Sequence, residues 1–170
     1  NRYKIGDADD AFKKCDLVVE KEVELQTVHQ GYIEPHSGTA IWDEDDRVKV
    51  WTSTQGSFSN RDSVSKVLNL DVSRVKVTPM EIGGGFGGKI PVYLEPIAAV
   101  LSKKSRRPVQ LVMSRTDVFD ASGPAPGGKV IVKIGVDKNG KMLAGYADIR
   151  LEAGGYPEAF IEAAAKCVFS

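Results

Sequence analysis

A run of eight residues, I-G-G-G-F-G-G-K at positions 82–89, constrains the fold of this chain more than any other stretch. Glycine lacks a Cβ, so its backbone can take conformations that other residues avoid, at an entropic cost of about 0.5–1 kcal/mol per glycine. Five glycines around Phe86 and Lys89 exceed what ordinary packing requires. The run therefore predicts a close approach of the backbone to a bulky ligand, and a tight turn with an aromatic plug is the alternative.

The dinucleotide-binding pattern G-x-G-x-x-G matches Gly83, Gly85 and Gly88. In that motif a helix begins directly after the glycines, whereas Pro91 favours extended backbone just before it. The motif also needs an acidic residue about 20 positions downstream. Residues 103–109 contain no acid, so this type of dinucleotide binding is disfavoured.

The P-loop pattern matches the same run only in part. Gly83, Gly88 and Lys89 fit its first seven positions. Its last position is a Ser or Thr whose hydroxyl binds Mg²⁺, and here that position is Ile90. An aliphatic side chain cannot bind the metal, so ATP hydrolysis is disfavoured.

Composition indicates an ordinary globular chain. Of the 170 residues, 42% are hydrophobic and 27% are charged, and 23 Lys and Arg balance 23 Asp and Glu. The apolar content is sufficient for a packed core, and a net charge of zero provides no general attraction for a polyanion. We therefore expect a single domain over residues 1–170 that does not bind nucleic acid.

Cellular location is predicted from what the sequence lacks. Cys15 and Cys167 form no C-x-x-C pair, which is typical of a reducing compartment. No apolar run approaches the roughly 20 residues of a membrane span, and the polar start at residues 1–4 does not resemble a signal peptide. We expect a cytoplasmic protein, and because the chain begins with Asn1 we expect it to be part of a longer polypeptide.

Apolar periodicity predicts an α+β fold, with a mixed sheet, β-hairpins and two to three helices packed on the sheet. Strands are expected at residues 17–26, 38–42, 47–52, 74–82, 108–113, 129–136 and 142–151, with hairpin turns at 43–46 and 137–141. Helices are expected from Ser59 or Asn60 to Asn69, around an apolar stripe of Leu94, Ile97, Ala98 and Leu101, and over residues 159–168. Residues 116–128 are expected to form a loop.

Two histidines lie seven residues apart, at His29 and His36. Their spacing does not match the zinc motif H-E-x-x-H, and both could reach one metal only if the backbone folded back through Pro35. Structural hydrogen bonding is the favoured interpretation. A polar run at residues 52–57 follows a predicted strand, in a position where loops often meet ligands.

Together these segments resemble the molybdenum-binding subunit of the xanthine dehydrogenase and aldehyde oxidase family. The order of the segments matches the family: His29 with Y-I-E-P at 32–35, V-W-T-S-T-Q at 50–55, the glycine run at 82–89, R-P-V at 107–109 with Ser114-Arg115, and Gly154-Gly155-Tyr156. They extend through nearly the whole chain.

The resemblance implies a molybdenum centre held by molybdopterin that hydroxylates a carbon of an aldehyde or N-heterocycle with water. For a prokaryotic source it implies the cytosine dinucleotide form of the cofactor. The electrons pass to [2Fe-2S] centres and FAD on other domains or subunits. The implied partners are therefore the rest of the molybdenum subunit, the Fe–S and FAD subunits, and a small substrate.

The resemblance also implies roles for particular residues. Gln55 matches an amide that hydrogen-bonds an oxygen ligand of molybdenum, and Phe86 matches a residue beside the metal, neither of them a covalent ligand. Phe86 and Ile90 are expected at the substrate pocket. The loop beside the cofactor corresponds to Gly84, Gly85, Phe86 and Gly87.

The chain departs from the family pattern in three respects. The Arg-His-Pro often found after the Ser-Arg segment is missing, since residues 122–126 read S-G-P-A-P. Purine-oxidising members carry Glu where this chain has Ile90, so purine hydroxylation is disfavoured. The family's catalytic Glu, in a G-x-G-E context, and its A-F-R-G-F-G segment are absent from these 170 residues. We expect a fragment that is inactive alone, and a non-catalytic scaffold or subunit-interaction domain of the same fold is the alternative.

Overall fold

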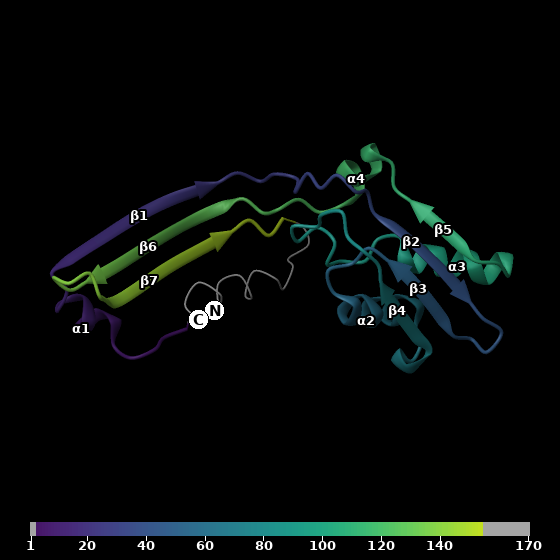
Figure 1. Ribbon diagram of the computed structural model, residues 1–170, viewed down its shortest axis with the longest axis horizontal. Helices are drawn as coiled ribbons and strands as arrows, with labels where there is room; N and C mark the ends of the chain where they lie inside the picture. Colours follow the sequence, from purple (N-terminus) through teal and green to yellow (C-terminus); the bar gives the residue numbers. More distant parts are fainter. Residues whose placement is uncertain (1–2, 155–170) are drawn as a thin grey trace. The chain divides into compact units, whose positions relative to one another are not determined.

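The computed structural model describes residues 3–154, within a chain that divides into two compact units. Unit 1 consists of residues 1–28 and 126–170, and unit 2 of residues 29–125 (Figure 1). The α+β class is confirmed, although the strands form two sheets rather than one. The single domain over residues 1–170 stays a prediction.

Unit 1 contains a three-stranded antiparallel sheet in the order β1-β6-β7, formed by β1 (Leu17–Leu25), β6 (Gly128–Val136) and β7 (Met142–Leu151). The predicted β6–β7 hairpin is confirmed: Gly140 has φ +81° and the Asp137 carboxylate accepts hydrogen bonds from Asn139 N and Lys141 N. The helix α1 (Ala8–Phe12) was not predicted. It begins where Asp7 accepts a hydrogen bond from Asp10 N.

Unit 2 contains a four-stranded sheet in the order β4-β3-β2-β5. Its strands are β2 (Ser37–Trp42), β3 (Val48–Thr52), β4 (Val75–Pro79) and β5 (Val109–Val112). The predicted hairpin of β2 and β3 is confirmed. β3 and β4 are parallel, and α2 (Ser57–Leu68) with the 3₁₀ turn η1 (Val72–Arg74) connects them.

The core of unit 2 lies between this sheet and two helices, α2 and α3 (Glu95–Ser105). It consists of Ala40, Val48, Val50, Val64, Val75, Ala98 and Ala99. The predicted stripe on α3 is confirmed in part: Ala98 is buried and Leu94 is partly buried, whereas Ile97 and Leu101 are exposed. Ala99 and Ser102 take the remaining buried positions of the helix.

The helix ends differ in part from expectation. α2 begins at Ser57, and Asn60 is buried inside it, where its amide donates to Glu95 Oε1 at 2.9 Å. Asn69 ends the helix in the left-handed conformation, φ +51°, near the predicted position. α4 (Arg115–Ala121) occupies part of the predicted loop. The predicted helix at 159–168, with Cys167 and Gly155-Tyr156, lies outside the described residues.

The parallel pair of strands determines where the site forms. Thr52 at the end of β3 pairs with Pro79 at the end of β4, and Met80 N donates to Thr52 O at 3.0 Å. The segment after β3 carries Gln55, and the segment after β4 carries residues 82–89. Because the carboxyl ends of parallel strands meet at one edge, the two segments leave the sheet side by side, where ligands commonly bind.

Candidate functional site

The structure brings the predicted residue Gln55 against the glycine run. Gln55 Oε1 accepts hydrogen bonds from Gly87 N at 3.0 Å and from Lys89 N at 3.2 Å. Gln55 N donates to Lys89 O at 3.0 Å. The side chain of Gln55 is thereby held to the backbone of a loop more than 30 residues away in sequence.

These bonds also determine which way the amide of Gln55 points. Only its carbonyl oxygen can accept from a backbone N–H, so the oxygen must face the loop and the nitrogen the other way. Gln55 is exposed, and Nε2 has no hydrogen-bond partner among residues 3–154. The site therefore offers an oriented amide donor to a ligand.

Gly85 makes the contact with Gln55 possible. A Cβ at Gly85 would lie 2.5 Å from Gln55 Oε1 and 2.6 Å from Gln55 Cδ, closer than real Cβ contacts allow. The φ angle of Gly85 is not in the left-handed region, so this glycine is needed for space rather than for conformation. Gly85 is thus explained by the approach of the backbone to Gln55.

The centre of the run is a tight turn closed by a hydrogen bond from Gly88 N to Gly85 O at 2.8 Å. Phe86 and Gly87 both have positive φ, +49° and +93°. Phe86 is 72% exposed, so its side chain does not form the aromatic plug of the alternative interpretation. Two roles stay predictions: the placement of Phe86 beside a metal, and the placement of Phe86 and half-buried Ile90 at a substrate pocket.

Three consecutive backbone N–H groups of the loop, those of Gly84, Gly85 and Phe86, have no acceptor in the described part of the chain. Gly84 itself has φ +92°. Adjacent backbone N–H groups in such turns form favourable positions for electron-rich groups of a ligand.

Glu34 holds both ends of the glycine run. Its Oε2 accepts from Gly83 N at 2.7 Å and from Lys89 Nζ at 2.5 Å, and Glu34 N donates to Gly83 O at 3.3 Å. The Lys89 side chain is fully buried and lies 5.1 Å from the centre of the Tyr32 ring. Its ammonium is therefore occupied, which agrees with the argument against a P-loop.

The ion pair also affects the protonation of Glu34. Partial burial acts to raise the pKa of Glu34, but the hydrogen bonds from Lys89 and Gly83 and the positive charge of Lys89 outweigh it and hold that pKa below its usual 4.5. Glu34 thus stays ionised at neutral pH. Sequence reasoning used Glu34 only as part of the segment 32–35 and missed this role.

The two histidines take hydrogen-bonding roles. His29 Nδ1 accepts from Gly31 N at 3.0 Å, so Nε2 of the neutral ring carries the proton and donates to Ser122 Oγ at 3.0 Å. His36 Nε2 lies 2.7 Å from Tyr32 OH. Within residues 3–154, no three or more His, Cys, Asp and Glu side chains are grouped to hold a metal ion.

Burial controls the protonation of His36. The imidazole is surrounded by protein, which lowers its pKa, and the nearby Lys89 charge lowers that pKa further. The Glu95 carboxylate opposes these effects without reversing them. His36 therefore remains neutral beside Tyr32.

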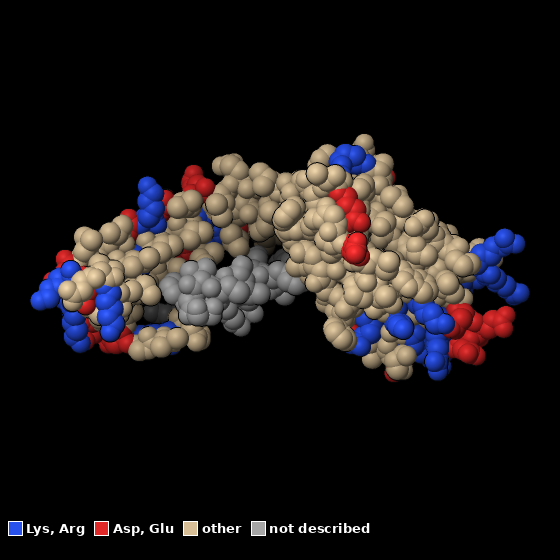
Figure 2. Space-filling view, in the orientation of Figure 1, with Lys and Arg blue, Asp and Glu red and all other residues tan. Residues whose placement is uncertain are grey.

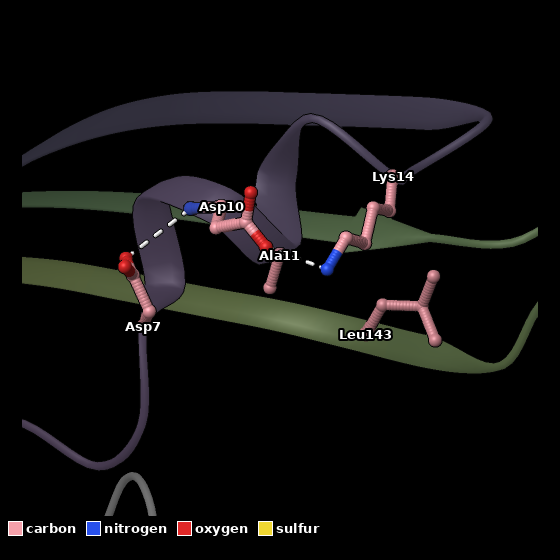
Figure 3. Close-up of a pocket in the computed structure, with 5 residues that line it drawn as sticks. All are labelled: Asp7, Asp10, Ala11, Lys14 and Leu143. Carbon is pink, nitrogen blue, oxygen red and sulfur yellow. Dashed lines mark hydrogen bonds and ion pairs between the residues drawn. The ribbon is translucent and has the colours of Figure 1, made fainter.

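A separate hollow in unit 1 is lined by Asp7, Asp10, Ala11, Lys14 and Leu143 (Figure 3). Both carboxylates already have partners inside the protein. Asp7 caps α1, and Asp10 pairs with Lys14 at 2.5 Å. The hollow therefore has a structural explanation.

The surface carries basic and acidic side chains, as expected from equal numbers of the two in the sequence. On the face shown in Figure 2, Lys and Arg lie next to Asp and Glu, in agreement with a formal net charge of zero. In the described part of the chain, no helix has the length and apolar character needed to cross a membrane.

Comparison with known proteins identifies the family of this chain. The family model described as the molybdopterin cofactor-binding domain matches residues 1–170. The nicotinate dehydrogenase large molybdopterin subunit of Eubacterium barkeri is 32% identical over 151 residues, which are 89% of this chain and 36% of that protein. Indole-3-acetaldehyde oxidase of Zea mays is 32% identical over 158 residues, which are 91% of this chain and 12% of the maize protein.

A solved structure has the same fold over most of the chain. Aldehyde oxidoreductase from Desulfovibrio gigas matches with a TM-score of 0.68 at 22% identity, covering 86% of this chain and 16% of that one. The chain thus spans about a third or less of the length of each of these relatives. The resemblance to molybdenum-binding subunits is confirmed, and because the family model matches the chain throughout, the protein belongs to the molybdopterin cofactor-binding domain family.

Proposed function

We propose that this chain is part of a molybdenum-dependent hydroxylase that oxidises an aldehyde or an N-heterocycle with water. The observation that carries the proposal is the oriented amide of Gln55, whose oxygen is held by the N–H groups of Gly87 and Lys89. The amide nitrogen is left to hydrogen-bond an oxygen atom of a bound cofactor. Curated relatives that are oxidoreductases with molybdopterin or aldehyde chemistry in their names support the assignment.

The chain's own residues fit a bulky pterin–metal group. The side chain of Gln55 and the backbone of Gly84 and Phe86 present donors with no acceptor among the described residues. The surroundings of Gly87 leave room for a ligand, since a Cβ built there would meet no atom within 4 Å. When bound, the molybdenum centre supplies the oxidation of the substrate carbon.

Gln55, Phe86 and Ile90 would contribute by orienting and shielding the cofactor and the substrate. The Gln55 amide would orient an oxygen ligand of the metal, and such indirect contacts typically change metal affinity or activity about 10–100-fold when removed. Phe86, exposed at the tip of the turn, would cover the cofactor against water, with Ile90 beside the substrate. An apolar Ile90 supplies no carboxylate for a purine, which favours aldehydes or simpler heterocycles.

We place the rest of the active site outside this chain. The chain covers 36% of the nicotinate dehydrogenase subunit and 12% of the maize oxidase, so most of each relative has no counterpart here. We propose that the catalytic Glu lies in that remainder and that the isolated chain does not turn over substrate. Fe–S and FAD groups are proposed on other domains or subunits, and the cytosine dinucleotide form of the cofactor for a prokaryotic source.

Replacing Gln55 in the intact protein tests this role. We expect Gln55→Ala to lower turnover of an aldehyde panel by about 10–100-fold, because the metal ligand loses its hydrogen bond. Gln110→Ala, at an exposed position of β5, is the matched control and should leave turnover unchanged. Equal turnover by Gln55→Ala and wild type, at equal molybdenum content, would show that Gln55 does not serve the cofactor.

A further inference from the structure

Tyr32 packs directly against the backbone of the glycine turn. Its side chain is buried, with 1% of the residue surface exposed. A Cβ built at Gly84 would lie 3.2 Å from Tyr32 Cβ, and one built at Gly88 would lie 2.7 Å from Tyr32 Cε1. The tyrosine side chain therefore contacts the turn at two points, which flank residues 85–87 in the sequence.

This contact explains why position 88 is a glycine. Real Cβ atoms essentially never come within 3.0 Å of another heavy atom, so a larger residue would push the turn away from Tyr32. The φ angle of Gly88 lies outside the left-handed region, so lack of space rather than backbone conformation excludes a side chain there. Gly84 differs, because its φ of +92° favours glycine even without the contact.

Hydrogen bonds fix the tyrosine ring at its hydroxyl end. Tyr32 OH lies 2.7 Å from His36 Nε2 and 3.2 Å from Ser122 Oγ. His36 directly precedes β2, and Ser122 directly follows α4. Ser122 Oγ in turn donates to Val118 O and is bonded by His29 Nε2 at 3.0 Å. The position of the ring is therefore set by residues outside the glycine run.

The face of the same ring meets the last residue of the run. The Lys89 ammonium lies 5.1 Å from the centre of the Tyr32 ring, within the range of a cation–π interaction. Glu34 binds that ammonium and also accepts from Gly83 N. Tyr32 thus supports the middle of the run, while Glu34 holds its two ends.

The supported turn is the part of the run that presents donors. The N–H groups of Gly84, Gly85 and Phe86 have no acceptor in the described part of the chain. Hydrogen-bond donors are useful to a ligand only in the right place, and a displacement of about 1 Å can lower a rate about 100-fold. The packing of the turn on Tyr32 therefore determines whether these donors meet their acceptors.

We infer that Tyr32 is a positioning residue for the cofactor: its ring fixes the turn so that the N–H groups of residues 84–86 lie where the bound group needs donors. The role rests on the proposed function, because the position of the turn affects turnover only if a cofactor occupies the site. Tyr32 acts through the turn. Its ring sets the position, whereas its hydroxyl contributes stability through His36 and Ser122.

Two substitutions in the intact protein separate the ring from the hydroxyl. Tyr32→Phe keeps the packing and loses the bonds to His36 and Ser122, so we expect lower stability with kcat within about twofold of wild type. Tyr32→Leu removes the ring carbon that meets Gly88. We expect its kcat for an aldehyde, per bound molybdenum, to fall at least about 10-fold while KM stays within about twofold.

Two results at Tyr32 would overturn the positioning role. One is a Tyr32→Leu variant with the wild-type kcat per molybdenum. The other is a Tyr32→Phe variant as slow as Tyr32→Leu, because the ring would then not be what fixes the turn.

Gly88→Ala disturbs the same contact from the loop and leaves Tyr32 unchanged. The new methyl group would meet Tyr32 Cε1 at 2.7 Å, so the turn must shift while the tyrosine hydroxyl keeps its partners. We expect the same fall in kcat per molybdenum, at least about 10-fold. This variant tests the role even if Tyr32→Leu does not fold, and an unchanged kcat would overturn it.

Val48→Ala is the control for general loss of stability. Val48 is fully buried in the core of unit 2, at the opposite end of β3 from the segment that carries Gln55. We expect this variant to be less stable than wild type with an unchanged kcat per molybdenum. A fall in kcat as large as that of Gly88→Ala would show that destabilisation alone slows the enzyme, and would overturn the role of Tyr32.

Hydrogen exchange of the intact protein, produced without molybdate, separates this role from the proposed function. The hydrogen-bonded N–H groups within residues 82–89 should exchange at least about 10-fold faster in Tyr32→Leu and Gly88→Ala than in wild type, and at the wild-type rate in Val48→Ala. Unchanged exchange would overturn the support of the turn by Tyr32.

The two measurements fail in different ways. Faster exchange combined with a wild-type kcat per molybdenum would overturn the positioning role and leave the proposed function standing. Wild-type protein that never contains molybdenum would refute the proposed function, and the positioning role with it, whatever the exchange rates are.

Discussion

Glu34 Oε2 lies 2.5 Å from Lys89 Nζ, and the same oxygen accepts a hydrogen bond from Gly83 N at 2.7 Å. One carboxylate oxygen therefore joins the two ends of the glycine run. Gln55 also holds the backbone of the run, at Gly87 and at Lys89. The loop that carries Phe86 is fixed by side chains from outside it, which explains how a glycine-rich segment can present a defined surface.

Removing the charge of Glu34 should destabilise the protein. In Glu34→Gln the buried Lys89 loses its counterion, and we expect the free energy of unfolding to fall by about 3 kcal/mol, as for broken buried ion pairs. Adding Lys89→Met should recover part of this loss, because no unpaired charge remains. Denaturant unfolding measures both variants.

A surface pair provides the control for this experiment. Asp10→Asn breaks the exposed pair with Lys14 and should cost less than about 1 kcal/mol. A Glu34→Gln variant that lost no more stability than Asp10→Asn would contradict the structural role of the Glu34–Lys89 pair.

Gly85 should tolerate no side chain. In Gly85→Ala the new methyl group would meet Gln55 Oε1 at 2.5 Å, so either Gln55 or the loop must move. We expect a loss of about 1–3 kcal/mol in unfolding free energy, as for overpacked sites, and displacement of the Gln55 amide. Denaturant unfolding and a crystal structure of the variant would measure the two effects.

Gly87→Ala separates crowding from backbone strain in this comparison. A Cβ at Gly87 meets no atom within 4 Å, but its φ of +93° is unfavourable for alanine. This variant should therefore lose stability without moving Gln55. If Gly85→Ala left Gln55 in place, the spatial explanation for Gly85 would be wrong.

His36 should make stability depend on pH in mildly acidic solution. Burial lowers its pKa below the usual 6.5 in the folded protein, so the unfolded chain binds the proton more readily. The contribution of neutral His36 to stability is complete above pH 6.5 and is lost as the pH falls from there towards the folded-state pKa. The slope from this one group is at most about 1.4 kcal/mol per pH unit.

Replacing His36 with Gln removes the titrating group while its amide can still bond Tyr32 OH. Unfolding free energies measured between pH 7.5 and 5.5 should then fall less steeply in His36→Gln than in wild type. Parallel curves for the two proteins would show that His36 is not held neutral by the fold.

Much of the fold was predictable because local rules governed it. The β2–β3 hairpin and the Asn139-Gly140 turn follow from alternation and turn residues, and the structure contains both. The helix α4 was missed although Ser114 and Asp117 form a capping box, because the Pro- and Gly-rich residues that follow suggested a loop throughout. The buried face of α3 was predicted only in part, because small Ala99 and Ser102 pack there beside Ala98 in place of the larger Ile97 and Leu101.

The site was predictable only through its resemblance to a family. The pairing of Gln55 with the glycine run depends on β3 and β4 being parallel neighbours, and no local pattern reveals this long-range pairing. The role of Glu34 was missed for the same reason: it lies 55 residues from Lys89 in sequence, and their contact arises from tertiary structure alone.

Molybdenum content is the most direct test of the central claim that the Gln55 site serves a molybdopterin cofactor. The measurement is elemental analysis of the intact protein that contains this chain, purified from its native host. We predict close to one molybdenum atom per polypeptide, with bound pterin released on denaturation. A fully folded intact protein without molybdenum or pterin would contradict the assignment.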